Sequence, residues 1–173
     1  MGNPAGGSAM SEAQLDPQEQ RVIDDVRRYG CHVVNVLADE PGEAEFSYTV
    51  GLPVTLRQPE AIVFALKKGL RQSVLNALLS RLRDGLKLSD GLRIPGLIEG
   101  HDCVARRISS PEAIRDHFGW AIWFHRAWNG TPITEAYQIV WPDSGTGLFP
   151  GDEGCDPGLA ALQPALYDAG STA

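Results

Sequence analysis

The sequence predicts an α+β domain, with a mostly antiparallel sheet of five to six strands and about three helices packed against it. The first observation is the order of segments, which is helix, three strands, helix, one or two strands, helix, strand. The second is that short turns join the early strands, as antiparallel neighbours allow. The third is that only one long helical segment, 70–83, stands where it could serve as a parallel crossover.

The first predicted helix begins with clear start signals. Asp16 is a typical N-cap, Pro17 suits the first helical position, and Glu19 stands three residues past the cap, as in a capping box. Gly30 is a typical left-handed end of a helix. Apolar residues recur between them at three- and four-residue spacing, which predicts one buried face: Val22, Ile23, Val26 and Tyr29.

Three strands are expected after this helix. Residues 31–38 are rich in β-branched side chains, 39–42 has turn chemistry, and 44–50 returns as a second strand, which together predict a hairpin. Residues 60–66 are almost wholly apolar, as is typical of a central strand. We expect the second and third strands to be neighbours in one sheet, with a break at 51–55 between them.

The middle of the chain contains the clearest amphipathic helix. Gly85 ends it, and its apolar positions keep a helical period from 70 to 83: Leu70, Val74, Leu75, Leu78, Leu79 and Leu82. Residues 86–100 contain several glycines and prolines, which predicts a loop with at most a short strand. Residues 101–108 return to strand character.

A helix and a strand are the last predicted elements. Ser110 and Pro111 start a third helix that runs to about Trp128, and residues 135–141 form the final strand. Beyond Pro142, the content of Gly, Pro and Asp predicts irregular chain.

Length and composition suit a single globular domain. The chain has 173 residues, of which 43% are hydrophobic and 21% are charged, a balance typical of soluble domains. We expect a flexible N-terminal segment at 1–15, one globular domain at 16–151 and a loosely ordered C-terminal tail at 152–173.

Charge and cysteine content argue against some classes of partner. The net charge of −7 and the pI near 5.0 disfavour nucleic acid, whose binding needs clustered Lys and Arg. No apolar run approaches the roughly 20 residues of a membrane span. Three cysteines are too few, and odd in number, for a disulfide framework. We therefore expect a cytoplasmic protein with no nucleic-acid or membrane partner.

Glu99 and His101 are candidates for acid–base catalysis. Residues two apart in a strand share a face, so Glu99, His101 and Cys103 would lie on one side if strand geometry extends back through Gly100. A carboxylate beside an imidazole forms an acid–base pair, since histidine titrates near neutral pH. The ends of this trio are ~13 Å apart, too far to share one metal ion, so we expect no metal site. A surface histidine beside a buried structural cysteine is the simpler interpretation.

His32, Tyr48, Thr49 and Gly51 are the other candidates, and they lie in or just after the first two strands. His32 could act as an acid or base, although a histidine satisfied by its neighbours is commoner. Tyr48 and Thr49 point to opposite faces, and an inward Tyr48 hydroxyl would orient a ligand. Thr49 and the Gly51 amide could hold an anionic or carbonyl group of a cofactor. Tyr and Thr are also simply good strand residues.

Aromatic residues gather late in the chain. Trp120, Trp123 and Trp128 cover a broad face of the third predicted helix. Exposed tryptophans would mark a surface that binds another protein, whereas core packing is the commoner role.

Several of these segments together resemble the motifs of a bacterial family, the domain of unknown function 4262. The resemblance covers about residues 29–151, with Gly151 standing where the family pattern usually has Trp. It rests on five segments in order: Phe46–Leu52, Pro59–Glu60 with the apolar strand after it, Leu97–Gly100, Gln138–Asp143 and Leu148–Pro150. It implies a cytoplasmic bacterial protein of one globular domain and supplies no catalytic residues.

A weaker similarity concerns the fold alone. The succession of hairpin, turn at Thr49–Gly51, apolar strand and helix is similar to the first half of flavin-binding split-barrel proteins. Those proteins hold the flavin phosphate with small hydroxylic residues and backbone amides. The similarity implies a split-barrel-like sheet and a flavin as one cofactor to test, while the sequence itself names no cofactor.

The function predicted from these observations is binding of a small molecule, or an enzyme that uses acid–base chemistry, in a pocket near the strand end Tyr48–Leu52. One alternative is a non-enzymatic module that binds a protein partner, of an accessory or immunity type. Another is a flavin-binding, split-barrel-like protein. The oligomeric state is not encoded in any motif.

Overall fold

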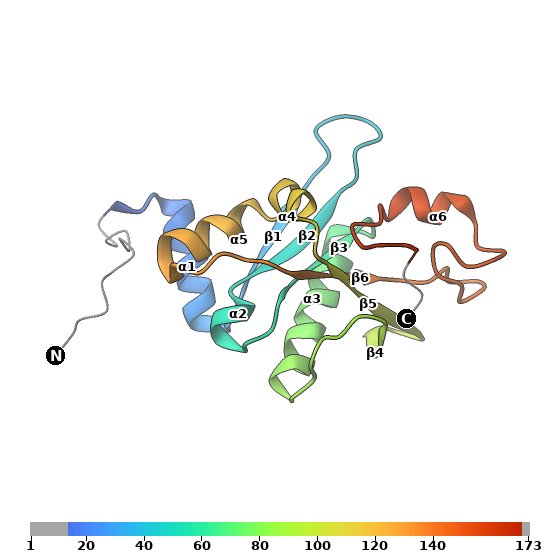
Figure 1. Cartoon of the computed structure of the whole chain (residues 1–173), viewed down its shortest axis with the longest axis horizontal. Coiled ribbons are helices and arrows are strands. Elements are labelled where there is room, and N and C mark those ends of the chain that lie inside the picture. The colour runs from blue at the N-terminus through green and yellow to red at the C-terminus, as the bar shows by residue number, and fades with distance from the viewer. Residues whose placement is uncertain (1–13, 171–173) are drawn as a thin grey trace.

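The computed structural model describes residues 14–170, so residues 1–13 of the predicted N-terminal segment lie outside the described part. The described chain forms one six-stranded sheet with helices on both faces (Figure 1). Its strands are β1 (His32–Val36), β2 (Phe46–Val50), β3 (Glu60–Phe64), β4 (Leu92–Ile98), β5 (His101–Ile108) and β6 (Ala136–Val140). Its helices are α1 (Pro17–Tyr29), α2 (Leu52–Thr55), α3 (Lys68–Arg83), α4 (Pro111–His117), α5 (Gly119–Phe124) and α6 (Pro157–Leu162), with a π-helical turn η2 (His125–Asn129) after α5.

The sheet has the order β1-β2-β3-β6-β5-β4. All neighbours are antiparallel except β3 and β6, so the α+β prediction with a mostly antiparallel sheet is confirmed. The parallel pair is joined through α3, β4, β5, α4 and α5, and not through α3 alone. The sheet is not closed into a barrel, because β1 and β4 stay apart as its two edges, so the possible split-barrel-like form is not found.

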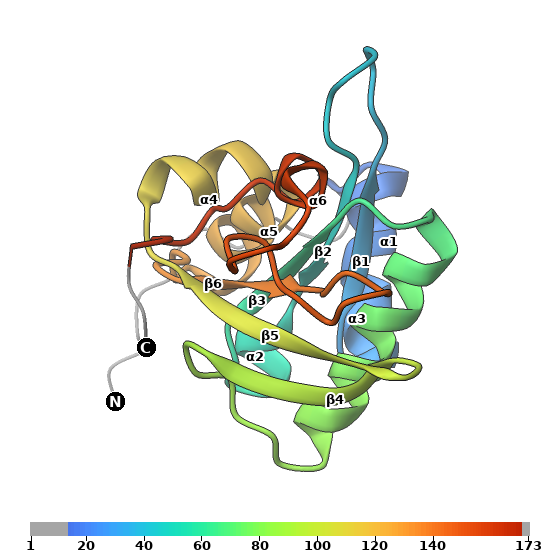
Figure 2. The ribbon, with the colours of Figure 1, turned by 90° about the vertical axis from the view of Figure 1, so that its right-hand side faces the viewer.

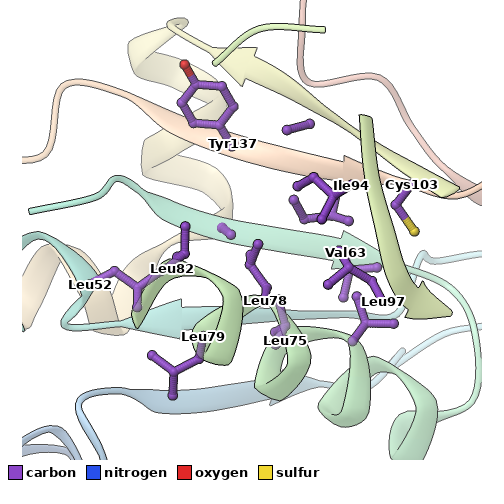
Figure 3. Close-up of a cluster of buried hydrophobic side chains, with 14 of the residues drawn as sticks. Leu52, Val63, Leu75, Leu78, Leu79, Leu82, Ile94, Leu97, Cys103 and Tyr137 are labelled. Carbon is purple, nitrogen blue, oxygen red and sulfur yellow. The ribbon is translucent and has the colours of Figure 1, made fainter. Parts of the chain in front are cut away.

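Two hydrophobic clusters lie on opposite faces of the sheet, because alternate residues of each strand face opposite sides. On one face, leucines of α3 pack against inward residues such as Val63 and Ile94 (Figure 3). On the other, α1, α4 and α5 cover the alternate residues, among them Ile62 and Phe64. Burial of both faces explains why all five residues of β3 are buried and why the four after Glu60 are apolar.

The start and end signals of α1 are confirmed. Asp16 and Glu19 form the capping box, and Gly30 ends the helix with φ at 86°. β2 and β3 are neighbours, as expected, with Tyr48 opposite Ile62.

The third predicted helix, from Ser110 to about Trp128, is not continuous. It breaks at Phe118, whose φ of −114° and ψ of 39° are neither helical nor extended, between α4 and α5. The break sends the Phe118 side chain into the core and frees the Trp120 amide to donate to the Tyr48 hydroxyl, 2.9 Å away. The apolar period of the sequence does not reveal this break, because Phe118 fits the helical pattern.

Helix α6 stands where the sequence analysis predicted irregular chain. Asp156 caps it through the Gly158 amide, and Pro157 occupies its first position. Just after it, the buried Gln163 side chain donates to the Trp141 carbonyl at 2.8 Å and accepts from the Trp141 amide at 3.1 Å. This paired contact attaches the segment after α6 to the end of β6.

Replacing Gln163 tests this attachment. Gln163→Ala leaves both backbone groups of Trp141 without their partner, so we expect a loss of ~1–3 kcal/mol in the free energy of unfolding. Urea denaturation followed by circular dichroism measures it. Leu162→Ala, at a residue 52% exposed, is the matched control and should change the stability by less than about 0.5 kcal/mol. Equal stability of the two variants would contradict the attachment.

Candidate functional site

Glu99 and His101 do not share a strand face. β4 ends at Ile98 and β5 starts at His101, so Glu99 and Gly100 form the hairpin turn, with φ of Gly100 at 78°. Glu99 is exposed, His101 is half-buried, and Cys103 is in the core, where burial raises the pKa of its thiol to about 12. The condition for a carboxylate–imidazole–thiol row, strand geometry through Gly100, is therefore not met.

Tyr48 is buried on the face covered by α1 and α5. Its hydroxyl accepts a hydrogen bond from the Trp120 amide at 2.9 Å. Burial, reinforced by the nearby charge of Glu60, raises the pKa of Tyr48 to about 12. The phenol thus stays protonated at neutral pH and serves to hold the broken helix against the sheet.

Thr49 and Gly51 surround the buried carboxylate of Glu60. Glu60 Oε1 accepts from Thr49 Oγ1 at 3.1 Å and from the Leu52 amide at 2.9 Å, and Oε2 accepts from the Gly51 amide at 2.7 Å. Thr49 Oγ1 in turn accepts from the Ala61 amide at 2.9 Å. The sequence segments around Phe46–Leu52 and Pro59–Glu60 are therefore joined through one side chain.

His125 completes this cluster from the other side. Its Nε2 lies 3.2 Å from Glu60 Oε2, and it donates there because a carboxylate only accepts. Glu60 is 0% exposed and His125 is 1% exposed. A group with no exposed surface cannot touch a solute, so this cluster, which we call the Glu60 cluster, has a structural role in this conformation.

Gly51 is required by the geometry of the cluster. Its φ of 109° lies in the left-handed region, and a Cβ there would come within 2.7 Å of Val26 Cγ1. Only glycine lets the chain turn sharply enough to present two successive amides to one carboxylate.

His32 lies on the edge strand β1 and faces α1. Its Nδ1 is 2.7 Å from Asp25 Oδ2, and its side chain is almost buried, with the residue 8% exposed. Among the described residues its Nε2 has no hydrogen-bond partner, yet this nitrogen is not sealed from solvent. The imidazole is therefore held by one nitrogen and open at the other.

An open groove of about 620 Å³ runs along the free edge of β1, between α1 and α3. Figure 2 shows these two helices beside β1, and they meet where an Arg83 guanidinium N–H donates to the Tyr29 carbonyl. We call it the β1-edge groove. Its walls are two helical stripes and the strand between them: Arg21, Asp25, Arg28 and Tyr29 of α1; Cys31, His32, Val33 and Asn35 on or next to β1; Gln72, Asn76, Leu79 and Arg83 of α3.

The helical periodicity of both walls is the signal that the sequence analysis missed. Residues 21, 25 and 28 repeat at helical spacing, and so do 72, 76, 79 and 83. Both stripes lie beside the apolar face of their helix, a position where polar residues usually contact solvent. The sequence alone therefore does not mark them as part of a site. The structure thus brings His32 to a groove with Asp25, and it places Tyr48, Thr49, Glu99 and His101 elsewhere.

The chemistry of the β1-edge groove favours proton transfer over a thiol nucleophile. Burial, with the charge of Glu60 as a smaller cause, raises the pKa of Cys31 to about 12, so its thiol stays protonated. Within residues 14–170 no group of three His, Cys, Asp or Glu side chains is placed to hold a metal ion.

The Glu60 cluster can be tested by one isosteric change. In the wild type, one carboxylate oxygen of Glu60 accepts from the Gly51 amide and the other from the Leu52 amide. In Glu60→Gln the new –NH2 group replaces one of these oxygens, so it must face a backbone N–H to which it cannot bond. We expect ~1–3 kcal/mol lower stability in urea denaturation. The exposed turn residue gives the control, since Glu99→Gln should stay within ~0.5 kcal/mol of the wild type. An unchanged midpoint for Glu60→Gln would show that the cluster is not required.

Comparison with known proteins identifies the family of the chain. The family model described as "Domain of unknown function (DUF4262)" matches residues 25–156. No curated protein and no solved structure matches the chain. Within the described residues, no helix is long and apolar enough to cross a membrane. Since the matched region covers most of the sequence, from the middle of α1 to the residue before α6, the chain belongs to the DUF4262 family.

Proposed function

We propose that the chain binds a small molecule in the β1-edge groove and acts on it by acid–base chemistry through His32. The observation that carries this proposal is the 2.7 Å contact between His32 Nδ1 and Asp25 Oδ2, two residues that line the groove. The Asp25 carboxylate accepts a hydrogen bond from Nδ1–H, so the lone pair of His32 is on Nε2 and is the basic site.

Asp25 has two roles in this arrangement. It holds the imidazole in the tautomer whose Nε2 accepts a proton, and it stabilises the imidazolium that forms when the proton arrives. The same Nε2 returns the proton to a leaving group or product, which makes His32 a general base and then a general acid. Asp25 is half-buried, so its charge is only partly screened by water.

The groove lies close to the strand end Tyr48–Leu52, where the sequence predicted a pocket, but does not include it. His32 pairs with Val50 across β1 and β2, so the groove and the segment Tyr48–Leu52 share one strand pair. The proposed site is on the outer edge of β1, whereas the inner side of that segment is occupied by the Glu60 cluster.

The alternatives have less support. Trp120, Trp123 and Trp128 are half-buried and pack against the second hydrophobic cluster, so they do not form a separate exposed surface. The flavin alternative depended on a split-barrel-like sheet, and the sheet is open. We propose a reducing, cytoplasmic location, supported by the free state of Cys31, Cys103 and Cys155.

The tautomer of His32 is the first test. Long-range ¹H–¹⁵N NMR spectra of the imidazoles at alkaline pH should show the Nδ1–H form for His32, because Asp25 accepts that hydrogen. Asp25→Asn should shift His32 toward the Nε2–H form, whereas Asp24→Asn, at the exposed neighbouring carboxylate, should not. An Nε2–H tautomer in the wild type would sink the acid–base proposal.

A ligand screen is the second test. Ligand-observed NMR with a library of small polar compounds should find binders of the wild type and of His101→Gln whose affinity falls about tenfold in His32→Gln, the loss expected for one strong hydrogen bond. His101 lies at the β4–β5 turn, away from the groove. Binders that lose affinity only in His101→Gln would move the site to that turn.

A further inference from the structure

The β1-edge groove is cationic in an acidic chain. Arg21, Arg28 and Arg83 line it, against one carboxylate, Asp25, while the whole chain has a net charge of −7. The Asp25 carboxylate is already engaged by His32. Arg21 and Arg28 are exposed residues of α1, and the Arg28 guanidinium carbon lies 5.3 Å from the ring centroid of Tyr29, which also lines the groove.

A buried relay sets the orientation of the Asn35 amide. Arg71 Nε donates to Ser47 Oγ at 2.9 Å, and an arginine only donates. Ser47 must then use its own hydrogen on Asn35, whose oxygen lies 2.6 Å away. The Asn35 carbonyl is thereby occupied, and its –NH2 group has no partner among the described residues. The relay leaves two N–H donors of Asn35 for the groove.

The α3 wall contributes donors in the same way. Gln72 Nε2 lies 3.4 Å from Asn76 Oδ1, which occupies that carbonyl. The Asn76 –NH2 group is left without a partner in the described part of the chain. Asn35 and Asn76 both line the groove. The groove is therefore lined by amide donors from the strand and from α3, and by guanidinium groups from α1.

Arg71, the first donor of this chain of hydrogen bonds, is itself held firmly in the core. It is 0% exposed, and its ionic partner is Glu45, 3.4 Å away. Its Nη1 also donates to the Ala65 and Leu66 carbonyls at 3.0 and 2.8 Å, while Nη2 has no hydrogen-bond partner within the described residues. Arg71 thus fixes Ser47, and through it the Asn35 amide, from a position with no exposed surface.

From these contacts we infer that the ligand of the β1-edge groove carries an oxyanion, a carboxylate or a phosphate group. Such a group accepts from guanidinium and amide N–H groups at once and balances the local positive charge. This inference rests on the proposed site and names its ligand class. The anion is bound by Arg21, Arg28 and Asn35, and the proton to be moved lies next to His32 Nε2 on the same molecule.

Isothermal titration calorimetry at low ionic strength tests the inference with two probes, inorganic phosphate and succinate, which separate phosphate from carboxylate preference. At least one should bind, and added NaCl should weaken the binding. Arg28→Gln and Arg21→Gln should each lower the affinity about tenfold, as expected for the loss of a charge-assisted contact. Lys87→Gln removes the same charge at an exposed residue away from the groove and is the matched control.

Asn35→Asp gives a second, isosteric test. The new carboxylate still accepts from Ser47 but replaces two donors with an acceptor and a negative charge, so anion binding should be lost while the stability in urea stays near that of the wild type. Amide shifts in ¹H–¹⁵N spectra should map the bound anion to α1, β1 and α3. Binding that is equal in Asn35→Asp and wild type would overturn the inference.

Failure of this inference can be told from failure of the proposed function. If phosphate or succinate binds through Arg21 and Arg28 but His32 lacks the Nδ1–H tautomer, the ligand class stands and the acid–base role falls. If neutral compounds bind in a His32-dependent way and neither anion binds, the acid–base site stands and the oxyanion inference is overturned.

Discussion

The buried carboxylate of Glu60 is the constraint on which the arrangement of this domain depends. A carboxylate with no exposed surface is strongly destabilising unless donors surround it, and here four groups supply them: the Thr49 hydroxyl, the Gly51 and Leu52 amides, and His125. These donors come from β2, the turn after it and the π-helical turn that follows α5. Satisfying one side chain therefore fixes where β2 ends, how sharply the chain turns, and where the late helical segment docks.

The Glu60 cluster also affects the position of the proposed site, although it shares no residue with that site. β2 bonds to β3 on one side and to β1 on the other, so holding the end of β2 also sets the register that places His32 opposite Val50 and Asn35 opposite Ser47. Ser47 accepts a hydrogen bond from Arg71 of α3 and donates one to Asn35. Helix α1 places Asp25 next to His32. The β1-edge groove is where these two helices approach the free edge of the sheet. Its proposed acid–base and anion-binding groups are thus carried by helices and a strand. Such elements hold side chains in a site more precisely than loops do.

Local signals in the sequence predicted much of the fold, and tertiary contacts account for what they missed. The Asp16 cap, the Gly30 end and the apolar strand after Pro59 act through neighbouring residues, so they can be recognised without the structure. The break at Phe118 and the docking of Gln163 depend on distant partners, Tyr48 and Trp141. The site follows the same rule: His32 was a candidate from its residue type, but Asp25 was not, because their pairing exists only once α1 folds back on β1. Thr49 and Gly51 were expected beside a ligand group, and the group that they contact is the carboxylate of Glu60 from the same chain.

Native-state hydrogen exchange of the Gly51 and Leu52 amides tests the central claim most directly. If both donate to a buried Glu60 carboxylate that the whole domain is built around, they should exchange only through global unfolding, with the same free energy of opening as the most protected amides of β3. Exchange much faster than that of the β3 amides would mean that the turn opens without unfolding. In that case the Glu60 cluster would not be the constraint that holds β2 and the groove beside it in place.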